Sequence, residues 1–294
     1  DLPGAVDGQL WYNSTATNFK FQYGATAAAW STGGNLNTGR KSLAGSGTQT
    51  AALAFGGDTG SLSALTESYN GSAWTEVNDL QTGRYLLAGC GTNTAALGFG
   101  GYAPGAPTVN TETWNGTNWT EVNNLNTNRY NLSGAGTNTS AIAIGGTPAP
   151  TGNTELWNGT NWTVVNNLNT ARQAGTAAGV SNTSALFFAG YDPAISAGTA
   201  KTESWNGTNW TETGDLNINR RYMAGAGTQT LALGFGGGPS ISAATEEFST
   251  TTVVGAWSTG GDLNTARTEL AGAGTQTAGL AFGGTTTTTI TETY

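Results

Sequence analysis

Residues 119–146 read WTEVNNLNTNRYNLSGAGTNTSAIAIGG, and this pattern recurs along the chain. A Trp is followed ten residues later by an Arg, then by a run of small residues, and then by an apolar run that ends in Gly-Gly. The Trp stands at positions 30, 74, 119, 162, 210 and 257, and the Arg at 40, 84, 129, 172, 220 and 267. A period of 43 to 48 residues predicts six copies of one structural unit.

Each repeat predicts four short strands. The small-residue run, as at 43–47, is the first strand, and the apolar run, as at 51–57, is the second. The third is the Thr-Glu-Thr-Trp segment at 111–114 or a close relative, and the fourth carries the marker Trp. An Asn-Gly step between them, as at Asn115-Gly116, favours a tight hairpin. Each repeat is therefore expected to be a four-stranded antiparallel meander.

The ends of the chain indicate how these meanders assemble. One meander has two apolar faces, so neighbours must stack radially into a ring. The last repeat stops at Tyr294 after a third strand, whereas residues 25–34 hold an unpartnered fourth strand. We therefore predict an all-β, six-bladed β-propeller over residues 25–294, closed by the N-terminal strand completing the last blade. Residues 1–24 are predicted to be an extension with a possible hairpin.

Composition excludes several classes of function. With 18 acidic and 10 basic residues the net charge is -8, which disfavours a nucleic-acid partner. The chain has no His and one Cys, so we expect no metal site, no cofactor and no internal disulfide. No stretch approaches the ~18 apolar residues of a membrane span, so membrane insertion is not expected. Asp1 in place of Met suggests a processed chain or a fragment.

The order of Arg, small-residue strand, Gly-Gly, aromatic strand and Trp resembles the Kelch repeat. The chain differs in lacking the common Pro before Arg and in having Ala189-Gly190 where other repeats have Gly-Gly. The resemblance implies a propeller; its galactose-oxidase-like members bind copper through His and Tyr, which this chain cannot do without His. Residues 8–14 and 19–22 resemble short segments of bacteriophage tail and fibre proteins, which implies a virion-associated or extracellular location.

Repetition distinguishes structural residues from functional ones, because a residue that is present in every blade is required by the structure of the blade. We expect the six Arg side chains to donate to loop carbonyls between blades. The recurring Glu of the third strand, as in Glu67, is expected on a solvated strand face. Paired glycines such as Gly45 and Gly47 are expected to let six strands crowd the axis, and Cys90 is expected to be a small core residue.

Asymmetry lies in the residues just after each Arg and in the loops between the second and third strands. In a meander these segments emerge on one face, and the side chains there include Tyr, Arg and Lys, which are suited to recognition. The predicted ligand-binding residues are Lys41, Tyr85, Tyr102, Tyr130, Tyr191, Asp192, Arg221 and Tyr222.

Three functions were weighed. A nucleophile, base and orienting group are not assembled by any motif, so no catalytic residue is predicted, and a carboxylate-only hydrolase is the remaining enzymatic alternative. The preferred hypothesis is a non-enzymatic module that binds a protein or a glycan. The alternative is a structural or decoration propeller in a larger assembly, such as a phage tail or an extracellular filament, attached through the N-terminal hairpin.

Overall fold

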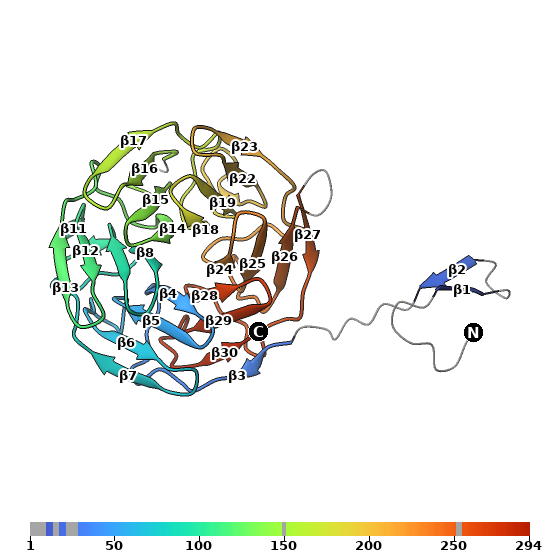
Figure 1. Ribbon diagram of the computed structural model, residues 1–294, viewed down its shortest axis with the longest axis horizontal. Helices are drawn as coiled ribbons and strands as arrows, with labels where there is room; N and C mark the ends of the chain where they lie inside the picture. The colour runs from blue at the N-terminus through green and yellow to red at the C-terminus, as the bar shows by residue number, and fades with distance from the viewer. Residues whose placement is uncertain (1–9, 14–17, 22–28, 149–150, 251–254) are drawn as a thin grey trace.

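Six four-stranded antiparallel sheets surround a central axis, so the protein is a six-bladed β-propeller (Figure 1). The computed structural model describes residues 10–13, 18–21, 29–148, 151–250 and 255–294. These residues form strands, turns and loops and contain no helix, which confirms the predicted fold class. Accordingly, the described residues include no helix that is long and apolar enough to cross a membrane.

Every blade runs from an inner strand near the axis to an outer strand at the rim. The blades are, in order, β4 (Ala44–Thr48), β5 (Ala51–Phe55), β6 (Thr66–Tyr69) and β7 (Trp74–Val77); β8 (Ala88–Gly91), β9 (Ala96–Phe99), β12 (Thr111–Trp114) and β13 (Trp119–Val122); β14 (Ser133–Thr137), β15 (Ser140–Ile144), β16 (Thr154–Trp157) and β17 (Trp162–Val165); β18 (Thr176–Ser181), β19 (Ser184–Phe188), β22 (Thr202–Trp205) and β23 (Trp210–Glu212); β24 (Ala224–Gly227), β25 (Leu231–Phe235), β26 (Thr245–Ser249) and β27 (Ala256–Thr259); β28 (Ala271–Thr275), β29 (Ala278–Phe282), β30 (Thr291–Thr293) and β3 (Ser31–Thr32).

Three two-stranded sheets lie outside the blades. The strands β10 (Tyr102–Ala103) and β11 (Ala106–Pro107) pair within a loop of blade two, and β20 (Tyr191–Asp192) and β21 (Ala197–Gly198) pair within a loop of blade four. The strands β1 (Leu10–Asn13) and β2 (Asn18–Phe21) form an antiparallel hairpin in the N-terminal extension. The remaining residues of the predicted hairpin segments lie outside the described residues.

The N-terminal strand closes the ring as predicted. Strand β3 pairs with β30, with Ser31 opposite Thr293 and Thr32 opposite Glu292. The preceding Trp30 is buried, and its ring centroid lies 4.8 Å from that of Phe235 in blade five and 5.0 Å from that of Tyr294. Closure therefore joins the two ends of the sequence by both strand pairing and core packing.

The hydrophobic core is divided among the gaps between neighbouring blades. In each fourth strand the marker Trp packs toward the preceding blade, as in Phe55 and Trp119, whose ring centroids are 4.8 Å apart. The Trp119 indole N–H donates to the hydroxyl of Thr66 in blade one over 3.0 Å. The equivalent bonds of the other five repeats are Trp30 to Thr245, Trp74 to Thr291, Trp162 to Thr111, Trp210 to Thr154 and Trp257 to Thr202. The repeated Trp therefore joins neighbouring blades by ring packing and by an indole hydrogen bond.

Glycine spacing in the inner strand reflects packing between blades as well as crowding at the axis. A Cβ at Gly45 would lie 2.5 Å from the Phe282 ring of the preceding blade, so the ring fits only because the side chain is absent. Gly47 has a φ of 102° at the start of the following tight turn. Two different requirements therefore produce the Gly-x-Gly pattern.

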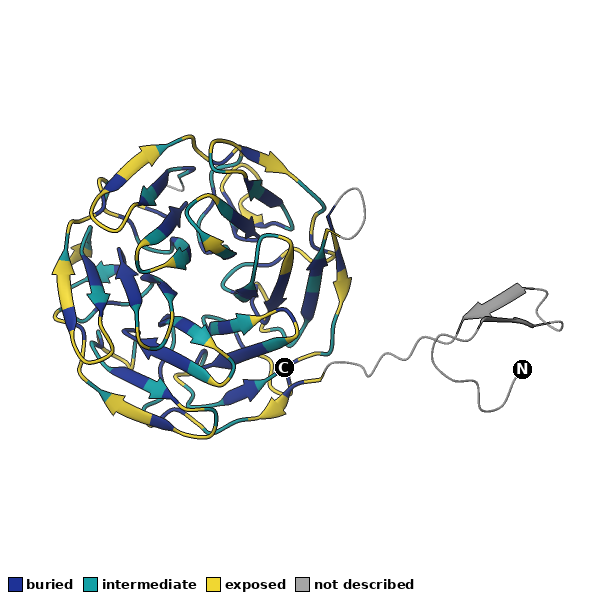
Figure 2. Ribbon diagram, in the orientation of Figure 1, coloured by how far each residue is buried: buried dark blue, intermediate teal, exposed yellow. Residues whose placement is uncertain are grey.

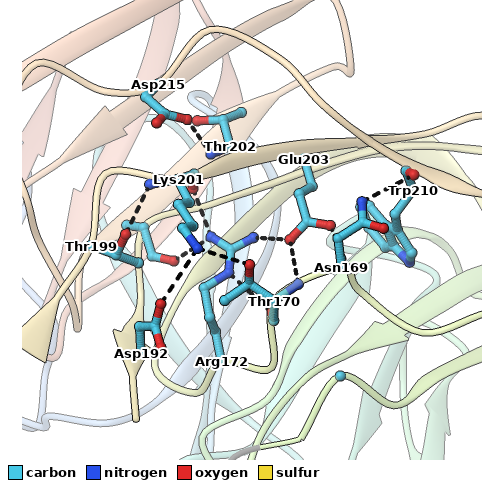
Figure 3. A network of polar contacts seen from close by, with 12 residues as sticks. Asn169, Thr170, Arg172, Asp192, Thr199, Lys201, Thr202, Glu203, Trp210 and Asp215 are labelled. Atoms are coloured by element: carbon cyan, nitrogen blue, oxygen red, sulfur yellow. Dashed lines mark hydrogen bonds and ion pairs between the residues drawn. The ribbon is translucent and has the colours of Figure 1, made fainter. Parts of the chain in front are cut away.

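The six repeated Arg residues are buried, and their hydrogen bonds differ from the sequence expectation in the blade to which they are made. Arg172 in Figure 3 donates through Nη1 to the carbonyls of Ala189 and Lys201, at 2.9 and 2.6 Å, and through Nη2 to Glu203 at 2.7 Å. Carbonyl bonding is confirmed. However, both carbonyls belong to blade four, which the Arg segment enters, so the Arg ties a connecting segment to its own blade.

The recurring Glu is not on a solvated strand face, so that prediction was wrong. Each Glu is buried and paired with an Arg, and its other carboxylate oxygen accepts a backbone N–H from the connecting segment, as between Glu203 and Asn169 at 2.7 Å. The ion pairs are Arg40–Glu67, Arg84–Glu112, Arg129–Glu155, Arg172–Glu203, Arg220–Glu246 and Arg267–Glu292. Figure 2 shows why the strand pattern misled: exposure is concentrated on the outermost strands, whereas third strands are largely buried.

Candidate binding face

The residues after each Arg meet the loops that follow the Gly pairs, as the meander predicts. Lys41 pairs with Asp58, Tyr85 with Tyr102, Tyr130 with Thr147, Gln173 with Tyr191, and Arg221 with Gly238, each as an antiparallel bridge. We call the surface formed by these two sets of segments the loop face. Seven of the eight predicted residues on it are partly exposed, and Asp192 is buried.

Three predicted tyrosines form one continuous aromatic cluster across blades two and three. The ring centroids of Tyr85 and Tyr102 are 5.5 Å apart, and Tyr102 meets Tyr130 edge-on at 5.4 Å. Burial, together with the nearby charges, raises the pKa of Tyr85, so its phenol stays a neutral hydrogen-bond donor. The cluster thus offers apolar ring surface combined with polar tips.

A second cluster joins blades four and five. The Arg221 guanidinium lies over the Tyr191 ring, with Cζ 5.3 Å from the ring centroid, and 5.7 Å from the centroid of the Tyr222 ring. Such cation–π contacts hold a flexible side chain in place and leave its N–H groups directed for bonding. This cluster is separate from the tyrosine cluster of blades two and three and from Lys41.

Lys41 lies at the junction of blades one and six. Its Nζ is 3.5 Å from Glu269 Oε2 and 4.0 Å from Asp58 Oδ2, and all three side chains are partly exposed. Exposed pairs of this kind contribute little to stability, about 0–1 kcal/mol. Their effect here is to balance charge locally, so Lys41 is not an isolated cation.

The Asp192 carboxylate contacts residues of its own blade. One carboxylate oxygen accepts the backbone N–H of Ala194 at 2.8 Å, and the other lies 3.6 Å from Lys201 Nζ. Figure 3 shows Lys201 also reaching Thr170, over 3.0 Å. Asp192 therefore stabilises the loop that carries Tyr191, and it is buried whereas Tyr191 is partly exposed.

A closed ring of backbone hydrogen bonds surrounds the axis at the loop face. The second residue after each Arg donates its N–H to the carbonyl of the equivalent residue in the preceding blade, over 2.8 to 3.0 Å. The donors are, in ring order, Ser42, Leu86, Asn131, Ala174, Tyr222 and Glu269. All six have φ between 54° and 57°, a left-handed conformation that costs a non-glycine residue roughly 1–2 kcal/mol.

These six residues line the mouth of an axial cavity of about 170 Å³. Sequence reasoning selected only Tyr222 among them and missed Ser42, Asn131 and Glu269 as site residues. The signal was available, because the six equivalent positions carry six different side chains. The cavity itself could not be inferred from these positions, because it forms only when the six blades close into a ring.

Among the described residues, no group of three or more Cys, Asp and Glu side chains is placed to hold a metal ion. Cys90 is buried beside a second axial cavity of about 90 Å³. Burial raises the pKa of its thiol to about 12, which leaves it a weak nucleophile.

The chain matches no family model, and no curated protein has a significantly similar sequence. The propeller architecture therefore stands on the structure, whereas the Kelch-type and phage-tail resemblances rest on residue patterns alone.

Proposed function

We propose that this protein is a non-enzymatic binding module that recognises a glycan or a protein through its loop face. The observation that carries the proposal is the aromatic cluster of Tyr85, Tyr102 and Tyr130, which breaks a six-fold scaffold at partly exposed positions. Tyr and Arg are, with Trp, the side chains most enriched at recognition hot spots, and Tyr buries a large area at low conformational-entropy cost.

The second cluster strengthens the proposal. Arg221 is held between two tyrosine rings, so its N–H groups are pre-oriented and lose little freedom on binding. Two clusters on different blades of one rigid ring provide separate anchor points for a single extended ligand. An extracellular or virion-associated location, which the phage-like N-terminal segment suggests, would place such a module where surface glycans and proteins are encountered.

A glycan array probed with the purified protein, together with affinity capture from candidate host-surface extracts, tests the proposal. Tyr85→Ala and Arg221→Ala should each weaken binding of any captured ligand by about tenfold or more, the effect of losing ~1–2 kcal/mol. Val164→Ala, which alters an exposed side chain on outer strand β17, is the matched control and should bind normally. Wild-type affinity in both test variants would contradict the proposal.

A structural role is the second candidate, and the N-terminal hairpin favours it. Strands β1 and β2 form a two-stranded sheet that joins no blade. An isolated hairpin is at best marginally stable in water, so packing against another protein would stabilise it. A decoration propeller would assemble through this segment and keep its loop face free; loss of assembly on deleting residues 1–24, with loop-face variants assembling normally, would favour this function over ligand binding.

A further inference from the structure

The axial cavity at the loop face carries an inference that deepens the proposed function and rests on it. The mouth positions adopt a left-handed backbone in every blade, yet none is glycine, although the chain has 46 glycines and uses many at positive φ. Glycine would relieve the conformational cost. The left-handed backbone recurs in all six blades and so belongs to the shared scaffold, whereas the side chain carried at this position differs in every blade.

Polar groups converge on the cavity from opposite blades. Glu269 of blade six accepts the Ser42 hydroxyl and the Lys41 ammonium through the same carboxylate oxygen, Oε2, at 2.8 and 3.5 Å. Within the described part of the chain no donor reaches its Oε1, and the side-chain amide of Asn131, three blades away in the ring, forms no hydrogen bond there. An acceptor and an amide thus face a shared space with unused capacity.

The remaining lining suits the carbon skeleton of a small polar ligand. Tyr222 and Leu86 line opposite blades of the mouth, and Ser133 and Thr176 are among the lining residues in two adjacent blades where the other four have Ala. An aromatic ring beside hydrogen-bonding groups matches a molecule that has both C–H surface and hydroxyls.

Size and charge narrow the ligand class. A cavity of about 150 Å³ can hold a six-membered ring such as benzene, so one of about 170 Å³ that opens at the loop face admits a single pyranose ring. Because the single Lys41 ammonium pairs with both the Glu269 and the Asp58 carboxylates, these three side chains together carry a net negative charge, which disfavours an anionic ligand. We propose that the axial cavity binds one neutral pyranose, the terminal sugar of a glycan, with Glu269 and Asn131 bonding its hydroxyls.

The repeat supplies matched variants for the test. Ala174→Leu places in blade four the side chain that blade two carries at the same φ, and it should fill part of the cavity. Asn131→Ala likewise copies blade four into blade three and removes only the amide. Glu269→Gln keeps the shape and removes the charge. Val164→Ala, on outer strand β17, is the control.

The probes are methyl glycosides of neutral hexoses, with N-acetylneuraminic acid and glucosamine as charged comparators, measured by saturation-transfer NMR and calorimetry on the full chain. We expect at least one neutral pyranoside to bind. Its affinity should be about tenfold lower in Ala174→Leu and in Asn131→Ala. Its affinity should also fall in Glu269→Gln, because a hydrogen bond to a charged acceptor contributes more than one to a neutral acceptor. Val164→Ala should bind the monosaccharide normally.

The outcomes separate this inference from the proposed function. Binding of a glycan or protein that needs Tyr85 but is unaffected by the cavity variants overturns the axial site and leaves the loop-face function intact. Binding of only the charged sugars also overturns it, as does failure of every neutral pyranoside to bind at millimolar concentration. If Ala174→Leu does not fold, Asn131→Ala and Glu269→Gln decide the result.

Discussion

Replacing Arg129 by Met should destabilise the propeller strongly without touching the loop-face clusters. The Arg129 guanidinium donates to the carbonyls of Gly145 and Asn153, at 2.8 and 2.9 Å, and to Glu155 at 2.8 Å, and it is buried. Burial lowers the pKa of the guanidinium, and the attraction of Glu155 opposes that shift. Met keeps most of the apolar stem but removes every one of these donors.

The magnitude follows from what the substitution leaves behind. Removing one partner of a buried ion pair typically costs about 3–5 kcal/mol, because the other charge remains buried. The Gly145 carbonyl also loses its Arg donor, whereas the Asn153 carbonyl still accepts the Gly145 backbone N–H, so the cost of the lost carbonyl bonds is smaller. Asn126 still donates to Glu155 from its backbone and side chain, so we expect a net loss near 4 kcal/mol rather than the sum of all these contributions. For a domain of this size about 4 kcal/mol lowers Tm by roughly 8 °C.

Urea unfolding followed by tryptophan fluorescence, together with calorimetry, provides the measurement. The double variant Arg129→Met/Glu155→Met removes both charges and should recover at least half of the loss, because Asn126 is exposed and can bond to water. A loss below about 1 kcal/mol in the single variant would refute the reasoning, and so would a double variant as unstable as the sum of the two singles.

Three further outcomes are expected. Deleting residues 1–24 should leave Tm unchanged, whereas deletion through Thr32 should cost about 3–5 kcal/mol and promote aggregation, because it removes the buried Trp30 indole and strips the edge of β30; equal Tm and solubility in the two truncations would disprove the closure. At pH 8 Cys90 should react with a thiol reagent roughly a thousandfold more slowly in the folded than in the unfolded protein, given a pKa of about 12 against 9.0, and rapid labelling of the folded chain would contradict its burial. Added copper should produce no oxidation of sugar alcohols, because the chain has no His, and copper-dependent turnover would overturn this expectation.

Much of the architecture could be predicted because the repeat is written into the sequence. The Trp and Arg spacing defined six units, the Asn-Gly steps defined hairpins, and the missing fourth strand after Tyr294 defined how the ring closes. Each of these depends on interactions within one repeat or on a count of strands, and such local information survives without coordinates.

The role of the recurring Glu could not be predicted in the same way. Alternation along a strand tells which residues share a face, but not whether a connecting segment covers that face. Glu155 and Arg129 are 26 residues apart, and they meet because the segment entering blade three folds back over its third strand. The sequence therefore showed that both residues repeat, while only the folded chain showed that they form a buried pair.

The candidate site, too, could be predicted from the sequence only in part. The sequence alone located the variable positions on one face, since a meander returns equivalent loops to the same side. Only the tertiary structure decided that Tyr85, Tyr102 and Tyr130 share one cluster, that Asp192 is enclosed by its loop, and that Ser42, Asn131 and Glu269 surround a common cavity. The physical reason is that the ring of backbone hydrogen bonds brings six segments, spread over more than 220 residues of sequence, around one axis.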